Sequence, residues 1–170
     1  MIRQHAELIR ATARRSKGDT ARIQHFIKVH GLASVIGTLE GLDRETQFIL
    51  ETAAILHDIG IRKSLEKYGS YTWKTQEEEG PAEAERLMRE VGGFSREQIA
   101  RVKYLIAHHH TYGETDGPDY RILLEADLLV NLHESQNKKK YEALIPRVFR
   151  TATGLELLNA LYERGEARTE

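Results

Sequence analysis

The sequence has no cysteine and only three prolines in 170 residues, and its formal net charge is −1. Without cysteine there is no disulfide, no thiolate zinc site and no thiol nucleophile. Any metal must therefore be bound by imidazole and carboxylate groups, which favours Fe, Mn, Co, Ni or Zn over Mg. The near-neutral charge gives no overall basic field, so we expect neither nucleic acid nor a membrane as a partner.

Long apolar runs are also missing, and no stretch approaches the ~18 apolar residues of a membrane span. The polar N-terminus, Met-Ile-Arg-Gln-His, lacks the apolar region of a secretory signal, so we expect a cytoplasmic protein. The sequence contains no repeat and no low-complexity linker. Its length suits one domain over residues 1–170 with a substantial core.

Apolar residues recur mostly at spacings of three and four, which together with the scarcity of proline predicts an all-α bundle of about six or seven helices. Residues 61–79 lack a clear period and are predicted to be a long loop, and residues 111–118 a turn-rich one. The predicted helices are 2–15, Asp19 to Gly41, Asp43 to Asp58 with Gly60 near the C′ position, Gly80 to Gly92, Ser95 (in a capping box with Gln98) to His110, Asp119 past Asp127, and one or two over 140–163 bent near Pro146.

Three helical segments carry ionisable side chains on otherwise apolar faces. His25 shares a buried stripe with Val29, and Asp127 lies on a face with Leu123. Because burying an unpaired carboxylate is costly, the usual remedies are a cationic partner or a metal.

The doublet His57-Asp58 ends the third of these segments. Its side chains lie about 100° apart around the helix, yet at a helix end both can reach one ion. A single metal bound by all of these side chains explains why ionisable groups interrupt three apolar faces. The alternative for each residue alone is a satisfied core histidine or an ion pair, such as Asp127 with Arg22.

The motifs occur in a fixed order within residues 19–131: His25 in Arg22-Ile-Gln-His25, the doublet in Leu-His57-Asp58-Ile-Gly60, and then Glu125-Ala-Asp127. In this arrangement the chain resembles the HD-domain superfamily of metal-dependent phosphohydrolases. The resemblance implies an all-α fold and hydrolysis of a small-molecule phosphoester, commonly a nucleotide. It also implies a metal-binding core over residues 19–131 with four ligands, namely His25, His57, Asp58 and Asp127.

Subfamilies with two metals carry further histidines between the doublet and the last aspartate, and His109 and His110 resemble that pair. Another histidine would be expected in the region of Gln76 to Gly80, where this chain has glutamates at 77–79. We therefore expect His109 and His110 to line the substrate pocket. A second metal and a solvated helix C-terminus are the alternatives.

A divalent cation lowers the pKa of bound water from about 15.7 towards about 7. We expect Asp58 or Asp127 to orient that water and accept its proton. We expect His109 or His110 to protonate the leaving oxygen.

Phosphoryl transfer also needs positive charge against the phosphoryl oxygens. Lys28, one turn after His25, is the first candidate, and Arg62 and Lys63 follow. In many relatives a lysine directly follows the His-Asp-Ile-Gly run, whereas this chain has Ile61 there.

Aromatic residues gather in the predicted loop at Tyr68, Tyr71 and Trp73, where they either anchor the loop on the core or stack a base. His5, His30 and His133 do not lie on the helix faces that carry the expected metal ligands, and we assign them no role. The favoured function is a metal-dependent phosphohydrolase. The alternatives are a di-iron oxygenase of the same superfamily and a non-catalytic nucleotide-binding regulatory module.

Overall fold

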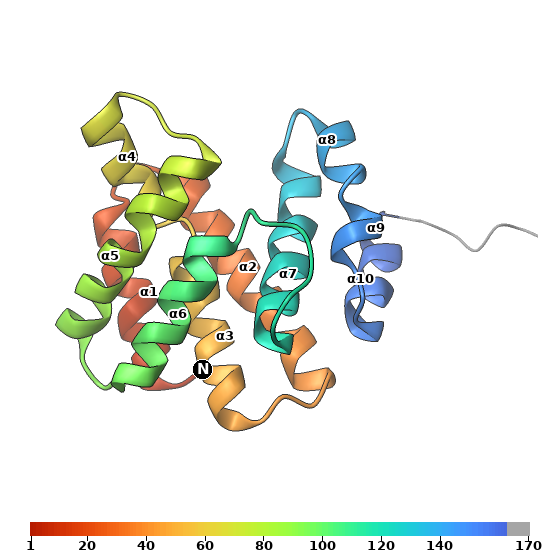
Figure 1. Ribbon diagram of the computed structural model, residues 1–170, viewed down its shortest axis with the longest axis horizontal. Coiled ribbons are helices and arrows are strands. Elements are labelled where there is room, and N and C mark those ends of the chain that lie inside the picture. Colours follow the sequence, from red (N-terminus) through yellow and green to blue (C-terminus); the bar gives the residue numbers. More distant parts are fainter. Residues whose placement is uncertain (163–170) are drawn as a thin grey trace, which may run out of the picture.

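The computed structural model describes residues 1–162, and the fold over that range is all-helical, as predicted (Figure 1). Eight helices have nine residues or more, close to the six or seven predicted. The elements are α1 (Arg3–Arg15), α2 (Thr20–Leu39), α3 (Arg44–Leu56), α4 (Gly60–Tyr68), α5 (Trp73–Val91), α6 (Arg96–His108), α7 (Pro118–Glu134), α8 (Lys138–Glu142), α9 (Ile145–Val148) and α10 (Ala152–Tyr162).

Side-chain caps fix several helix starts at the predicted residues. The Asp19 carboxylate accepts a hydrogen bond from the backbone N–H of Arg22 at 3.0 Å, which satisfies a free donor at the start of α2. Asp43 caps α3 in the same way. Ser95 and Gln98 form both hydrogen bonds of the predicted capping box before α6.

The prediction of a long loop over residues 61–79 is wrong, because most of this segment is helical. Helix α4 ends at Gly69, whose φ of 72° suits glycine, and α5 starts at Thr72, which forms a reciprocal cap with Thr75. Pro81 therefore lies inside α5 instead of starting it. The periodicity was hard to see because α4 turns a small polar residue, Ser64, towards the core.

Gly60 is required by close packing and not by the left-handed C′ conformation predicted for it. It begins α4 where this helix meets α5. A Cβ at residue 60 would lie 2.7 Å from both the carbonyl oxygen of Gln76 and the backbone nitrogen of Gly80. The two glycines therefore let the two backbones approach each other.

The C-terminal part differs from the predicted one or two helices over 140–163. It contains three short helices, and Pro146 lies in the first turn of α9, where a missing N–H costs nothing. The fully buried Glu125 of α7 accepts hydrogen bonds from the backbone N–H groups of Arg150 (2.7 Å) and Thr151 (2.9 Å). Residue 163, where the last predicted helix ends, and the rest of the predicted domain up to residue 170 lie outside the described residues.

Helix packing buries the C-terminal end of α3 and the middle of α7. Helix α2 packs against both α3 and α7, α6 packs against α3, and α5 packs against α4 and α6. Figure 1 shows α7 with α8, α9 and α10 on one side of the molecule and α1, α3, α4, α5 and α6 on the other, while α2 runs across to pack against α7. The core is formed by apolar side chains of these helices, among them Phe26, Leu50, Leu56, Ile106 and Leu123.

Among residues 1–162, no helix has the length and apolar character needed to cross a membrane.

Candidate metal centre

The four predicted metal ligands come from three helices that meet in the core. His25 lies on α2, Asp127 lies on α7, and the doublet follows the last turn of α3. His57 and Asp127 are only 1% and 4% exposed. Such burial of ionisable groups requires compensation by partners or by an ion.

The structure brings these four side chains together around one point. The Nε2 atoms of His25 and His57 lie 3.1 Å apart. Oδ1 of Asp127 lies 3.2 Å from Nε2 of His25 and 3.5 Å from Nε2 of His57. Oδ2 of Asp58 lies 3.7 Å from each of the same two nitrogens.

The hydrogen bonds of the two imidazoles indicate which nitrogen carries the proton. Nδ1 of His57 donates to the carbonyl oxygen of Ala54 at 2.9 Å, and Nδ1 of His25 donates to Oε2 of Glu134 at 2.8 Å. In neutral imidazoles this leaves a lone pair on each Nε2, directed at the other and at a carboxylate oxygen. A cation relieves that repulsion, and the set of two imidazoles and two carboxylates suits a divalent transition metal.

The electrostatics of the cluster also favour positive charge. Although burial lowers the pKa of His25, its hydrogen bond with Asp127 and the charges of Asp127 and Asp58 raise that pKa to about 10. Burial raises the pKa of Asp127, but His25 and His57 hold it well below its usual range. A metal ion therefore competes with protons for these groups.

A second cluster shares Asp58 with the first. Its members are Asp58, His109 and His110, whose ligand atoms lie within 4.8 Å of one another. His109 is fully buried, and its Nδ1 donates to the carbonyl oxygen of Ile106 at 2.7 Å. Its Nε2 has no hydrogen-bond partner and lies 3.7 Å from Oδ1 of Asp58. This arrangement is compatible with the second metal that the sequence left as an alternative.

The region where the resemblance called for another histidine lies beside His110. Nε2 of His110 is 3.4 Å from Oε1 of Gln76, and its backbone N–H donates to Oε1 of Glu77 at 3.0 Å. Burial, followed by the charge of His109, lowers the pKa of His110 to about 3. At neutral pH the His110 imidazole is therefore uncharged and suited to accept a hydrogen bond or bind a cation.

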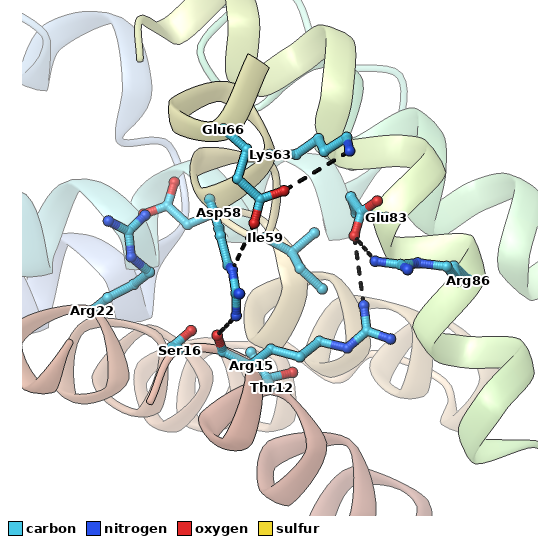
Figure 2. Close-up of a pocket in the computed structure, with 11 residues that line it drawn as sticks. Thr12, Arg15, Ser16, Arg22, Asp58, Ile59, Lys63, Glu66, Glu83 and Arg86 are labelled. Atoms are coloured by element: carbon cyan, nitrogen blue, oxygen red, sulfur yellow. Dashed lines mark hydrogen bonds and ion pairs between the residues drawn. The ribbon is translucent and has the colours of Figure 1, made fainter. Parts of the chain in front are cut away.

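A basic pocket of about 330 Å³ opens beside Asp58, between α1, α2, α4 and α5 (Figure 2). Arg62 and Lys63, predicted from the sequence as phosphate contacts, both line it, and both pair with Glu66, at 3.0 and 3.9 Å. The basic residues of the lining are Arg15, Arg22, Arg62, Lys63 and Arg86. These five cationic side chains outnumber the three carboxylates of the lining, Asp58, Glu66 and Glu83, so the pocket has an excess of positive charge.

Lys28, the first candidate for phosphate binding, is not part of this pocket. Its ammonium group lies 2.8 Å from Oε1 of Glu134, the carboxylate whose other oxygen binds His25. Arg22, considered from the sequence only as an ion-pair partner of Asp127, lines the pocket instead. Its Nε pairs with Asp19 at 2.8 Å, whereas its buried Nη1 has no hydrogen-bond partner. The sequence feature that could have indicated Arg22 is its position three residues before His25, on the same face of α2.

An aromatic pocket of about 500 Å³ is lined in part by His110 of the second cluster. Tyr71 and Trp73 line it and are 49% and 59% exposed, so they do not anchor the segment on the core. Tyr68 lies elsewhere and donates from its hydroxyl to Glu79 at 2.9 Å. The full lining is Tyr71, Thr72, Trp73, Gln76, His110, Tyr112, Lys140 and Tyr141.

Comparison with known families agrees with this geometry. A family model of the HD domain matches residues 22–148, and the chain therefore belongs to the HD-domain family. Proteins of this superfamily are typically metal-dependent hydrolases that bind divalent metals, and the histidine and acidic clusters of this chain are compatible with metal binding. No curated protein and no solved structure matches the chain significantly.

Proposed function

We propose that this protein is a metal-dependent phosphohydrolase that cleaves a small phosphoester, preferably a nucleotide. The observation that carries the proposal is the position of Asp58. Its carboxylate faces the imidazoles of His25 and His57, and the residue also lines a pocket with five basic side chains. A cation-binding cluster and an anion-binding pocket thus share a wall, which is what metal-assisted phosphoester hydrolysis needs.

The proposed roles follow from the contacts of each residue. His25, His57, Asp58 and Asp127 would hold a divalent cation, which would supply Lewis acidity and lower the pKa of water. Asp58 orients the attacking water and accepts its proton on the carboxylate. Burial lowers the pKa of His109, but its contact with Asp58 raises that pKa above its usual value. In its protonated form His109 carries a second proton on Nε2, which it provides to the leaving oxygen.

Substrate binding is proposed to use both pockets. Arg22 takes the phosphate-binding role first expected of Lys28, because this residue lines the basic pocket and has a guanidinium nitrogen without a hydrogen-bond partner among residues 1–162. The exposed rings of Tyr71 and Trp73 offer stacking surfaces for a base, next to His110. Asp58 of the second cluster lines the basic pocket, and His110 of the same cluster lines the aromatic pocket.

A substrate panel tests the proposal. The protein is stripped of metal with a chelator, reloaded with Mn²⁺, Fe²⁺, Co²⁺, Ni²⁺ or Zn²⁺, and assayed with nucleoside monophosphates, cyclic nucleotides and non-nucleotide phosphate esters. We expect hydrolysis only in the reloaded samples, and faster hydrolysis of nucleotides.

The other functions give different results in the same panel. Oxygen consumption by iron-loaded protein without phosphoester cleavage would support the di-iron oxygenase, which needs the second cluster to be filled. Nucleotide binding without turnover under every metal would support the regulatory module. The basic lining of the pocket favours phosphate chemistry over both.

Replacing Arg22 by glutamine is expected to raise the KM for the phosphoester by about 10- to 100-fold, with a smaller change in kcat. A hydrogen bond to a charged group contributes about 1.5–3 kcal/mol, and each 1.36 kcal/mol corresponds to a factor of ten. Steady-state kinetics measure the effect. Arg44→Gln, at an exposed position that starts α3, is the matched control. Equal KM values for the two variants would remove Arg22 from the substrate site.

A further inference from the structure

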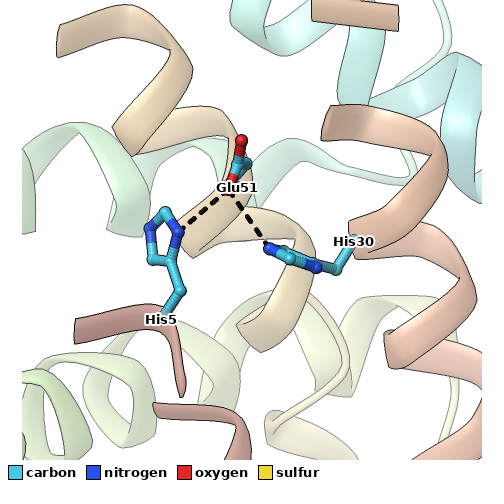
Figure 3. Close-up of side chains that lie close together, drawn as sticks. All are labelled: His5, His30 and Glu51. Carbon is cyan, nitrogen blue, oxygen red and sulfur yellow. Dashed lines mark ion pairs between the residues drawn. The ribbon is translucent and has the colours of Figure 1, made fainter. Parts of the chain in front are cut away.

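Two buried histidines and one partly buried glutamate outside the metal centre converge from three different helices (Figure 3). His5 comes from α1, His30 from α2 and Glu51 from α3, and their ligand atoms lie within 4.8 Å of one another. His5 is 1% exposed and His30 7%. None of these residues takes part in the centre around Asp58 and Asp127.

The hydrogen bonds of Thr52 fix the tautomer of His5. The Thr52 hydroxyl donates its only hydrogen to the carbonyl oxygen of Phe48, at 2.8 Å. It therefore accepts the hydrogen bond that joins it to Nε2 of His5, at 3.1 Å. With Nε2 protonated, Nδ1 of a neutral His5 bears a lone pair. That lone pair faces Oε2 of Glu51, 2.9 Å away.

His30 meets the same carboxylate oxygen from the opposite side. Its Nε2 lies 3.3 Å from Oε2 of Glu51. Neither this nitrogen nor Nδ1 of His5 has a hydrogen-bond partner, although both are buried. Two buried imidazole nitrogens and one carboxylate oxygen thus point at a common place, and no hydrogen bond of good geometry joins either nitrogen to the oxygen.

The Glu51 carboxylate is ionised and held in orientation from its other side. Its Oε1 accepts hydrogen bonds from Oγ of Ser34 (3.0 Å) and Nε2 of Gln47 (2.7 Å). Burial raises the pKa of Glu51, but the contacts with His30 and His5, and these two hydrogen bonds, hold it well below its usual range. Oε2 is therefore a negatively charged atom that faces the two imidazole nitrogens.

We propose that Nδ1 of His5, Nε2 of His30 and Oε2 of Glu51 form a separate binding site for a divalent transition metal of the Zn²⁺ type. In a tetrahedral site with bonds of about 2.0–2.1 Å the ligand atoms lie about 3.3 Å apart, and the carboxylate oxygen here lies 2.9 and 3.3 Å from the two nitrogens. A set of two imidazoles and one carboxylate selects Zn²⁺, Co²⁺ or Ni²⁺ over Ca²⁺ and Mg²⁺. Water completes the coordination.

The proposed ion has a structural purpose in this fold. Helix α1 precedes the segment matched by the HD domain, which begins at residue 22. An ion bound by His5, His30 and Glu51 ties α1 to α2 and α3. Helix α1 also supplies Arg15 to the basic pocket, so the ion fixes the helix that carries this side chain. The site does not depend on the proposed phosphohydrolase activity.

The test separates this ion from any ion bound by the cluster of His25, His57, Asp58 and Asp127. We call that cluster the HD centre. The parent is the isosteric variant Asp58→Asn/Asp127→Asn, which lacks both carboxylates of that centre. Zn²⁺ and Co²⁺ affinities are measured by competition with a chromophoric chelator, and bound metal by elemental analysis after desalting. We expect the parent to keep one ion per chain and to unfold at a higher temperature with Zn²⁺ than without it.

Adding His5→Gln or Glu51→Gln to the parent is expected to weaken Zn²⁺ binding by at least about 100-fold, since even supporting residues around a metal change affinity by 10–100-fold. The same additions abolish the shift in unfolding temperature. His133→Gln, at an exposed histidine of α7, is the matched control and keeps the ion. Should His5→Gln fail to fold, Glu51→Gln decides. A parent without bound metal, or equal metal content in parent and Glu51→Gln, overturns the proposal and leaves a proton-bridged ion pair.

Discussion

A His57→Ala protein is expected to lose the metal of the HD centre and to cleave its phosphoester at least about a thousandfold more slowly than wild type. His57 contributes a buried Nε2 that lies 3.1 Å from the Nε2 of His25 and 3.5 Å from Asp127. Alanine removes one of the four ligands from a site with no nearby replacement on α3. Metal catalysis contributes several kcal/mol, and each 1.36 kcal/mol corresponds to a factor of ten in rate.

Metal content by elemental analysis and kcat on the best substrate of the panel measure this effect together. His133→Ala is the matched control, because His133 is an exposed histidine on α7. Circular dichroism checks that both variants remain helical. Unchanged turnover by a His57→Ala protein that binds at least one metal ion fewer per chain than wild type would rule out the proposed mechanism.

Gly60→Ala is expected to lower the free energy of unfolding by about 2–3 kcal/mol, at the upper end of the cost of overpacking. The new Cβ would lie 2.7 Å from Gln76 O and Gly80 N, and 2.9 Å from the Cα of Gly80. These are backbone atoms, so no side chain can rotate away to relieve the clash. Chemical denaturation with urea measures the loss.

Gly31→Ala provides the opposite result in the same protein. Gly31 lies inside α2, is exposed, and has no atom within 4 Å of an added Cβ. Alanine there is expected to stabilise the protein by about 0.5–1 kcal/mol, because it limits the unfolded chain and suits a helix. Equal changes in the free energy of unfolding for the two substitutions would show that the close contact between α4 and α5 is not the reason for glycine at residue 60. Because Gly60 is two residues from Asp58, activity should fall with stability only in Gly60→Ala.

The sequence predicted the parts of this structure that local rules control. Asp43 and the pair Ser95 and Gln98 mark helix starts because caps act within one turn. The convergence of His25 and Asp127 was also accessible, since each residue interrupts an apolar face and only a shared partner explains both.

The features that were missed depend on packing between helices. Residues 61–79 form most of α4 and the start of α5 because Gly60 and Gly80 let these helices touch, and periodicity does not reveal such a contact. His5 received no role because its partners, His30 and Glu51, lie on other helices. The sequence favoured Lys28 as a phosphate contact, whereas Arg22 lines the basic pocket. This difference also depends on packing between helices, because the Lys28 ammonium pairs with Glu134 of α7.

Glu134 joins the surface of the molecule to its interior. One carboxylate oxygen binds the half-exposed ammonium of Lys28, and the other holds the proton on Nδ1 of His25. Removing the charge of Lys28, for instance by acetylation, would leave more negative charge on Glu134 to be shared with the ring. The imidazole would then become more basic and a stronger electron donor. Through Glu134, the charge of Lys28 thus influences the basicity of His25 without direct contact with the ring.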